Sequence, residues 1–288
     1  MATLSQWLTT NQVSLYVIVI LLGLLIGSFL NVVIHRLPLM LQREWQQECA
    51  ELNGASTATE PTFNLCTPRS RCPHCQQQLS ALDNIPLLSW LFLRGRCRYC
   101  KAGISKRYPL IELSAAALSA FAIWRFGASP QLLAALIFSW ALLCMTMIDI
   151  DHLLLPDNLT LPLLWLGLLL NIDTLFVSLQ DAVLGAAIGY GVLWSLYWVF
   201  KLATGKEGMG YGDFKLLAAL GAWFGWQAVL PILLLSSVAG SILGLSLMAS
   251  KRLSAERALP FGPALALAGW IYLIWGQQLT SWYWSVAL

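Results

Sequence analysis

Two aspartates beside long apolar runs are the residues of this sequence best suited to chemistry. Asp149 directly follows the largely apolar residues 144–148, and Asp213 closes the motif Gly-Tyr-Gly-Asp ahead of another apolar run. Ionisable groups at membrane depth are costly, so they mark a functional site by default. Two carboxylates that meet can share a proton, one with a low pKa and one with a high pKa. Such a pair can supply the acid and the base for hydrolysis, as in aspartic proteases.

Two further carboxylates compete with Asp149 for this role. Asp157 follows Pro156 and precedes an apolar segment, so we expect its side chain to cap a helix. Asp151 lies further toward water, where a carboxylate costs little. Asp149 is the deepest of the three. We favour it as catalytic over a simple helix-terminal polar group, because Asp213 gives it a partner.

Two glycines shape the approach to the second aspartate. Gly210 and Gly212 precede Asp213 in the order Gly-x-Gly-Asp. Glycine lacks a side-chain wall, so a substrate backbone can come close to the carboxylate. A phosphate-binding loop is a poor alternative, because the chain lacks the G-x-x-x-x-G-K-[ST] pattern. Ordinary loop glycines are the remaining alternative.

Four cysteines form two C-x-x-C pairs with 21 residues between them. Each pair makes a tight turn that directs two thiolates at one metal ion, which suits tetrahedral zinc. Unrelated thiols or disulfides are the alternative, and a reducing cytoplasm disfavours disulfides. Four cysteines close the coordination shell, so we expect a structural metal. The predicted ligands are Cys72, Cys75, Cys97 and Cys100, which leaves Cys49, Cys66 and Cys144 free.

The composition identifies the surroundings of these groups as a membrane. Hydrophobic residues make up 58% of the 288 positions and charged residues only 11%, whereas soluble domains carry about 25% charged residues. Residues 1–12 carry no Lys or Arg, so the first apolar segment is expected to remain as a membrane helix and not to be cleaved as a signal.

Apolar runs near the length of a membrane crossing, about 20 residues, divide the chain into three parts. Residues 1–34 hold the first membrane helix, 35–107 a polar loop domain with the zinc site, and 108–288 a membrane core of seven helices. The sequence thus predicts an all-α polytopic protein with about eight transmembrane helices. The expected spans are 13–34, 108–126, 131–149, 158–175, 180–200, 213–228, 230–249 and 260–277.

The basic residues predict the orientation. Of 17 Lys and Arg, 16 lie in or next to three loops that eight spans place on one side, and only Arg125 falls on the other. Basic loops stay in the cytoplasm, so both termini are expected in the periplasm. The third span then ends, and the sixth begins, at the cytoplasmic boundary. Asp149 and Asp213 can therefore meet although 64 residues separate them.

Three polar residues interrupt the first two spans. Ser28 and Asn31 lie in the first, and Glu112 lies in the second. Hydrogen bonds between helices are the modest explanation for all three. Glu112 is the strongest candidate of the three for a functional role, because a carboxylate is costly to bury.

Taken together, these segments resemble the type IV prepilin leader peptidases, and the resemblance covers nearly the whole chain. Each segment alone is a weak signal, but the complete set in this order is highly specific. The matching segments are Gly27–Pro38, the two C-x-x-C pairs, Arg107–Glu112, the Asp149 region, Gly210–Asp213 and Leu259–Pro263.

The resemblance implies a bifunctional enzyme of the bacterial inner membrane. It would be a G-x-G-D aspartic endopeptidase that removes short basic leaders from prepilins and pseudopilins at the cytoplasmic face. It would then methylate the new N-terminal residue with S-adenosylmethionine, for which the sequence indicates no binding residues. Asp149 and Asp213 match the family's catalytic pair, and the four paired cysteines match its zinc ligands. No nucleic-acid partner is expected.

Three other classes of protein share some of these features. A proton-coupled transporter also uses carboxylates in the membrane, but it would show inverted repeats and broken helices at mid-membrane. A non-catalytic scaffold that binds a partner through its zinc site would tolerate Asp213→Asn. A methyltransferase without protease activity would leave the leader uncut.

An acidic segment interrupts the basic loop domain. Residues 41–65 contain Glu44, Glu48, Glu51 and Glu60 against Arg43 alone. Opposite charge would attract a basic leader toward the aspartates in a salt-sensitive way. A solvated, variable insertion is the alternative, and we favour it slightly.

Overall fold

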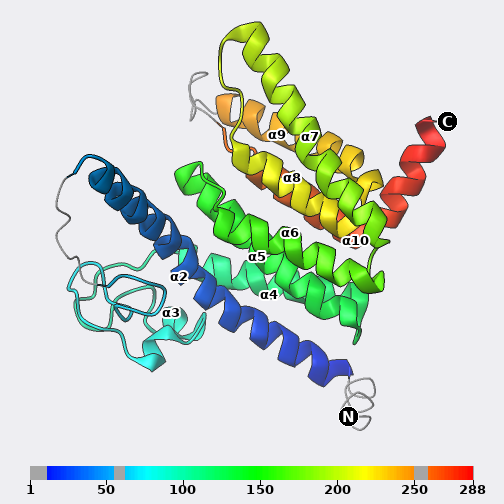
Figure 1. Cartoon of the computed structure of the whole chain (residues 1–288). Helices are drawn as coiled ribbons and strands as arrows, with labels where there is room; N and C mark the ends of the chain where they lie inside the picture. The colour runs from blue at the N-terminus through cyan, green and yellow to red at the C-terminus, as the bar shows by residue number, and fades with distance from the viewer. Residues whose placement is uncertain (1–11, 55–61, 250–258, 288) are drawn as a thin grey trace. The chain divides into compact units, whose positions relative to one another are not determined.

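The structure is a computed structural model that describes residues 12–54, 62–249 and 259–287. Within these ranges the fold is helical, with two isolated β-bridges and no extended strand, so the predicted all-α class is confirmed. The chain forms two compact units, Met1–Ala128 and Ser129–Leu288, which we describe separately (Figure 1). Glu60 and the basic loop 250–258 lie outside the described residues.

Two long helices of the first unit pack through small residues. α2 (Gln12–Leu52) and α4 (Arg107–Phe126) approach so closely that a Cβ at Gly23 would lie 2.5 Å from the Ser119 Oγ. A Cβ at Gly27 would lie 2.7 Å from the Cα of Glu112. Close contact between backbones at small residues is typical of membrane helices. Their association depends on close packing, because no hydrophobic force acts between helices surrounded by lipid.

The hydrogen bonds expected of the polar residues are present between these helices. The Asn31 side chain donates to the Tyr108 carbonyl at 3.2 Å. The buried Glu112 carboxylate interacts with the Ser28 side chain and also accepts the N–H of Leu87 at 2.8 Å. Glu112 therefore connects both membrane helices to the loop domain.

α2 continues well past the predicted end of the first span at residue 34. Its 41 residues correspond to roughly 60 Å, about twice the thickness of the hydrocarbon core. Arg36 donates from this helix to the carbonyls of Asn64, Leu65 and Pro68 and so holds the loop domain against it. Glu44, Glu48 and Glu51 are exposed on the last turns of α2; the role of the acidic segment stays a prediction.

The loop domain contains little regular structure. A 3-10 turn, η1 (Ala81–Asn84), and a short helix, α3 (Leu88–Phe92), separate the two cysteine pairs. Ser80 and Asp83 form a reciprocal capping box at the start of η1, which satisfies backbone donors that a helix start leaves free.

The second unit is built around α8 (Tyr211–Phe224), in which every residue from Leu216 to Phe224 is buried. α7 (Leu179–Thr204) crosses α8 at backbone contact, since a Cβ at Gly185 would lie 2.3 Å from the Gly221 carbonyl oxygen. The indole N–H of Trp223 donates to Leu163 of α6 at 2.8 Å. The remaining helices are α5 (Pro130–His152), α6 (Asp157–Leu170), η2 (Asn171–Asp173), α9 (Trp226–Ala249) and α10 (Gly262–Ala287).

Each of the eight predicted apolar segments coincides with a helix, but eight crossings are not confirmed. By length and composition, five helices among the described residues could cross a membrane: α2, α4, α5, α7 and α9. α6 and α8 have 14 residues each, or about 21 Å, which is shorter than the hydrocarbon core. The apolar part of α10, Gly262–Gly276, is also shorter than a full span.

The sixth and seventh segments are separate helices, as predicted, but the break lies elsewhere. We expected it near Gln227 to Pro231. α8 instead ends at Gly225, whose φ of +81° lies in the region that favours glycine. Pro231 lies inside α9, as its sixth residue. It removes one hydrogen bond of the helix there but does not end it.

Candidate active site and metal centre

Asp149 lies in the last turn of α5 and is almost fully buried, with 5% of its surface exposed. Its Oδ2 accepts the backbone N–H of Gly262, the first residue of α10, at 3.1 Å. The free N–H groups at a helix start favour a negative charge. A Cβ at Gly262 would lie 2.6 Å from the same oxygen, so this close approach requires glycine.

Asp213 lies in the first turn of α8, three residues after the N-cap residue Gly210. Its N–H donates to the Gly210 carbonyl at 3.2 Å, and its carboxyl group hydrogen-bonds the backbone of Gly210. Asp213 is 7% exposed. The Gly-x-Gly-Asp segment is thus the turn that starts α8, with the carboxylate folded back over it.

The second unit brings the two aspartates together. The charge of Asp149 acts on the Asp213 carboxyl group. Leu155, between α5 and α6, lies close to a glycine beside each aspartate. A Cβ at Gly212, next to Asp213, would lie 2.7 Å from the Leu155 Cβ. A Cβ at Gly262, which binds Asp149, would lie 3.2 Å from the Leu155 Cδ1. Two buried carboxylates in electrostatic contact are the arrangement that acid–base hydrolysis needs.

The two competing aspartates have different surroundings. Asp157 is the first residue of α6, but Pro156 takes the N-cap position and no side chain caps the helix, so the predicted cap is wrong. Both Asp157 carboxylate oxygens instead bind the Lys215 ammonium at 2.7 Å. Lys215 lies on α8, so the ion pair ties the start of α6 to the helix that carries Asp213. Asp151 is exposed.

A polar cluster not predicted from the sequence anchors the loop ahead of Asp213. Lys201, near the end of α7, donates to Glu207 at 2.9 Å and to the Tyr197 hydroxyl at 3.1 Å. The Tyr197 hydroxyl donates to the same Glu207 oxygen at 3.2 Å. The Lys201 ammonium and the Tyr197 hydroxyl lower the pKa of Glu207.

The ring of Tyr197 extends this contact to the residues on either side of Asp213. Tyr197 is 2% exposed, and its centroid lies 5.4 Å from that of Tyr211 and 5.7 Å from that of Phe214. Phe214 follows Asp213 directly, and Tyr211 precedes it by two positions. No pattern in the sequence predicts this cluster. Its members come from α7 and from the segment around Asp213, and only the fold brings them together.

The four paired cysteines converge in the loop domain. Their sulfur atoms all lie within 4.8 Å of one another, and the Sγ atoms of Cys72 and Cys100 are 3.8 Å apart. A tetrahedral zinc ion with Zn–S bonds of about 2.3 Å needs sulfurs roughly 3.8 Å apart. The residues therefore fit zinc.

The two cysteine turns share one local geometry. Cys72 and Cys97 each donate their N–H to the carbonyl five residues later, at 3.0 and 2.8 Å. Antiparallel bridges, Arg71 to Gln78 and Arg96 to Gly103, close the turns. Backbone N–H groups of Cys75 and His74 lower the pKa of Cys72 to about 6, which favours the thiolate that a metal requires.

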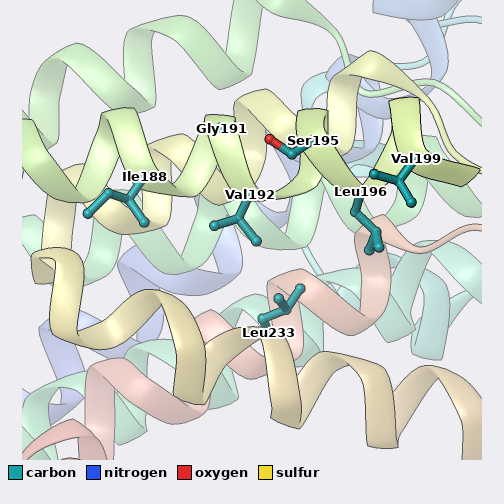
Figure 2. A pocket seen from close by; sticks show the side chains of 7 residues that line it. All are labelled: Ile188, Gly191, Val192, Ser195, Leu196, Val199 and Leu233. Carbon is teal, nitrogen blue, oxygen red and sulfur yellow. The ribbon is translucent and has the colours of Figure 1, made fainter.

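An apolar groove of about 610 Å³ follows α7 in the second unit (Figure 2). Its lining holds no titratable side chain, so acid–base chemistry does not take place there. The lining residues are Ile188, Gly191, Val192, Ser195, Leu196, Val199 and Leu233.

Comparison with known proteins covers both units. Residues 21–126 match the bacterial peptidase A24 N-terminal domain, and residues 136–245 match the type IV leader peptidase family. No solved structure was found to match.

Several relatives are similar over nearly their full length, and each is named a prepilin leader peptidase/N-methyltransferase. The relative from Stutzerimonas stutzeri is 56% identical over 96% of both chains. Those from Aeromonas hydrophila and Pseudomonas aeruginosa are 59% and 52% identical, over 92% and 97% of both chains. With this identity along nearly the whole chain, the protein belongs to the type IV leader peptidase family.

Proposed function

We propose that this protein is a bifunctional enzyme of the bacterial inner membrane that cleaves leader peptides from prepilins and pseudopilins. It then methylates the new N-terminal residue with S-adenosylmethionine. The observation that carries the peptidase function is the buried Asp149–Asp213 pair. The names of the similar proteins supply the substrate class and the second activity.

In the proposed cleavage, one aspartate removes a proton from a water molecule that attacks the scissile carbonyl. The other protonates the carbonyl oxygen or the leaving amine. Interacting carboxylates share their titration steps, so we assign the two roles to the pair and not to either residue. A Cβ at Gly210 would come no nearer than 4.0 Å to the Asp213 Oδ2, so the space between Gly210 and this carboxylate is not filled.

Zinc has a structural part in this proposal. Cys72, Cys75, Cys97 and Cys100 would hold it, and it would supply the crosslink that fixes two turns of a loop domain with little regular structure. We assign zinc binding to residues 35–107 and cleavage to residues 108–288.

The active site is proposed to face the cytoplasm, with both termini in the periplasm. The distribution of basic residues supports this orientation. It also suits a substrate whose basic leader stays on the cytoplasmic side.

One assay separates these activities from the alternatives. Purified protein in phospholipid vesicles is incubated with a prepilin and S-adenosylmethionine, and mass spectrometry determines the new N-terminus. We expect a shortened, methylated product. Methylation of uncut substrate, or no product at all, would contradict the peptidase and favour a methyltransferase or a scaffold.

A further inference from the structure

The short helix α3 presents a strongly apolar face to its surroundings. Leu88, Leu91 and Phe92 are 52%, 61% and 83% exposed. They are spaced i, i+3, i+4 and so share one side of the helix. Leu82, in η1, is 64% exposed as well. An apolar face this exposed on a small domain marks an interaction site.

The opposite side of α3 is fixed to the loop domain. The Trp90 indole donates to the Ile104 carbonyl at 3.3 Å, and the Trp90 ring covers Gly95, where a Cβ would lie 2.9 Å from it. The Ser89 hydroxyl donates to the Asp83 carbonyl at 2.7 Å. These contacts set the orientation of the helix, so its apolar face is a fixed surface.

A hydrogen bond to a membrane helix sets the depth of this face. Leu87, directly before α3, donates its N–H to the Glu112 carboxylate of α4 at 2.8 Å. Glu112 is five residues into a helix that begins at Arg107, which is about 7.5 Å along its axis. Side chains of a helix tilt toward its N-terminus, so the carboxylate reaches back toward the membrane surface. With the first turn of α4 at the membrane boundary, as the predicted span 108–126 places it, α3 starts at the level of the lipid headgroups.

The charges around α3 complement an anionic lipid surface. Between residues 80 and 107 the only acid is Asp83, and it pairs with Arg98 at 2.8 Å. Arg94, Arg96 and Lys101 are exposed on the turns that follow α3. Basic side chains near an apolar helix face are typical of segments that lie in the membrane interface.

We propose that α3 is a membrane-interface helix, whose apolar face enters the boundary between headgroups and acyl chains beside α4. Glu112 holds the helix at this depth, and the nearby arginines bind anionic headgroups. The loop domain would thus be attached to the bilayer at a third point, besides α2 and α4. This inference rests on α4 crossing the membrane and not on the proposed catalysis.

Nitroxide labels measure this depth directly. Zinc-loaded protein with Cys49, Cys66 and Cys144 replaced by Ser is labelled at Leu91→Cys or Phe92→Cys. It is reconstituted in vesicles of phosphatidylethanolamine and phosphatidylglycerol. We expect oxygen, which concentrates in lipid, to broaden these spectra more than a water-soluble nickel chelate does. The control label at Gln77→Cys, on an exposed cysteine turn, should show the reverse.

Glu112 variants test what holds the helix. Glu112→Gln keeps an oxygen that can accept the Leu87 N–H and should leave the label at residue 92 in lipid. Glu112→Leu removes the acceptor and should move it toward water. Strong broadening by the nickel chelate at residues 91 and 92 in the parent protein would overturn the proposal. Protection from both reagents would also overturn it, because protein would then cover the face.

Discussion

Residue 262 has a glycine because the Asp149 carboxylate occupies the space that a side chain would need. The same holds at residue 212, where Leu155 fills that space. The catalytic candidates are thus held by backbone groups and by one leucine. Substitutions at these positions separate the chemistry of the carboxylates from their placement.

The carboxylates themselves give the first prediction. Asp149→Asn and Asp213→Asn should each abolish prepilin cleavage, since an amide can replace neither the acid nor the base. The double variant should be no worse than either single one, because residues that act as a unit are not additive. Initial rates of leader release measure this. Asp157→Asn, which weakens only the ion pair with Lys215, should retain substantial activity; the opposite pattern would identify Asp157 as the catalytic residue.

Gly262 gives the second prediction. Gly262→Ala would place a methyl group 2.6 Å from the Asp149 Oδ2, so the carboxylate must move. A displacement near 1 Å can cost roughly 100-fold in rate, and we expect kcat to fall by about that factor. Gly191→Ala is the matched control, since a Cβ there meets nothing within 4 Å. Equal kcat for both variants would show that Asp149 tolerates displacement.

The sequence was sufficient to predict the two aspartates but not their supports. Asp149 and Asp213 could be identified because a charged residue is conspicuous in an apolar run. Leu155 looks ordinary in the sequence, and Gly262 could be noticed only as part of the matching segment Leu259–Pro263. The roles of both depend on which side chains approach which glycines in the fold. Lys215 could have been noticed as a basic residue two positions after Asp213, but its partner could not.

At the level of elements, the loop between α7 and α8 is held by Lys201, Glu207 and Tyr197. Glu207→Ala removes both hydrogen bonds to the loop. We expect kcat to fall at least several-fold with little change in KM, because the Asp213 carboxylate is displaced while substrate binding is unaffected. Glu207→Gln keeps an oxygen for the Tyr197 hydroxyl and should recover most of the rate.

Lys206→Ala is the control for this loop, since it removes a neighbouring exposed charge and leaves the three contacts in place. If it slowed cleavage as much as Glu207→Ala, charge in the loop would matter and the anchor would not.

The zinc turns give a prediction for the loop domain. Purified protein should contain about one zinc per chain, since four thiolates complete one tetrahedral site. Replacing Cys72 and Cys75 by Ser should release the metal and increase amide hydrogen exchange between residues 71 and 103. Metal analysis and exchange measured by mass spectrometry test both effects. Stoichiometric zinc in this variant would refute the ligand set.

Helix boundaries were harder to predict than helices. A hydrophobic run ends where polar residues begin, yet α2 continues through a polar, exposed stretch to Leu52, and the loop domain contacts it at Arg36. The break between α8 and α9 falls at Gly225, where a positive φ ends the helix. One glycine within an apolar run gives little indication that it has this conformation.

At the scale of the whole molecule, the lengths of the helices and the distribution of charge bear on the number of membrane crossings. Eight helices follow the predicted segments, but α6, α8 and the apolar part of α10 are shorter than a bilayer core. A short helix can still contribute to a membrane core when longer neighbours surround it, as they do α8. We therefore base the proposed topology on the distribution of basic residues, which does not depend on the length of any helix.

Labelling of single cysteines tests that topology. All but one of the 17 basic residues lie in or next to the segments assigned to the cytoplasm, and moving so many charges across the membrane is strongly disfavoured. With Cys49, Cys66 and Cys144 replaced, a cysteine at position 7 should react with a membrane-impermeant maleimide added to intact cells. One at position 60 should react only after the inner membrane is opened. Both positions lie outside the described residues, so the test is independent of the structure. Labelling of both from one side would place the aspartates on the wrong face for a substrate whose basic leader stays in the cytoplasm.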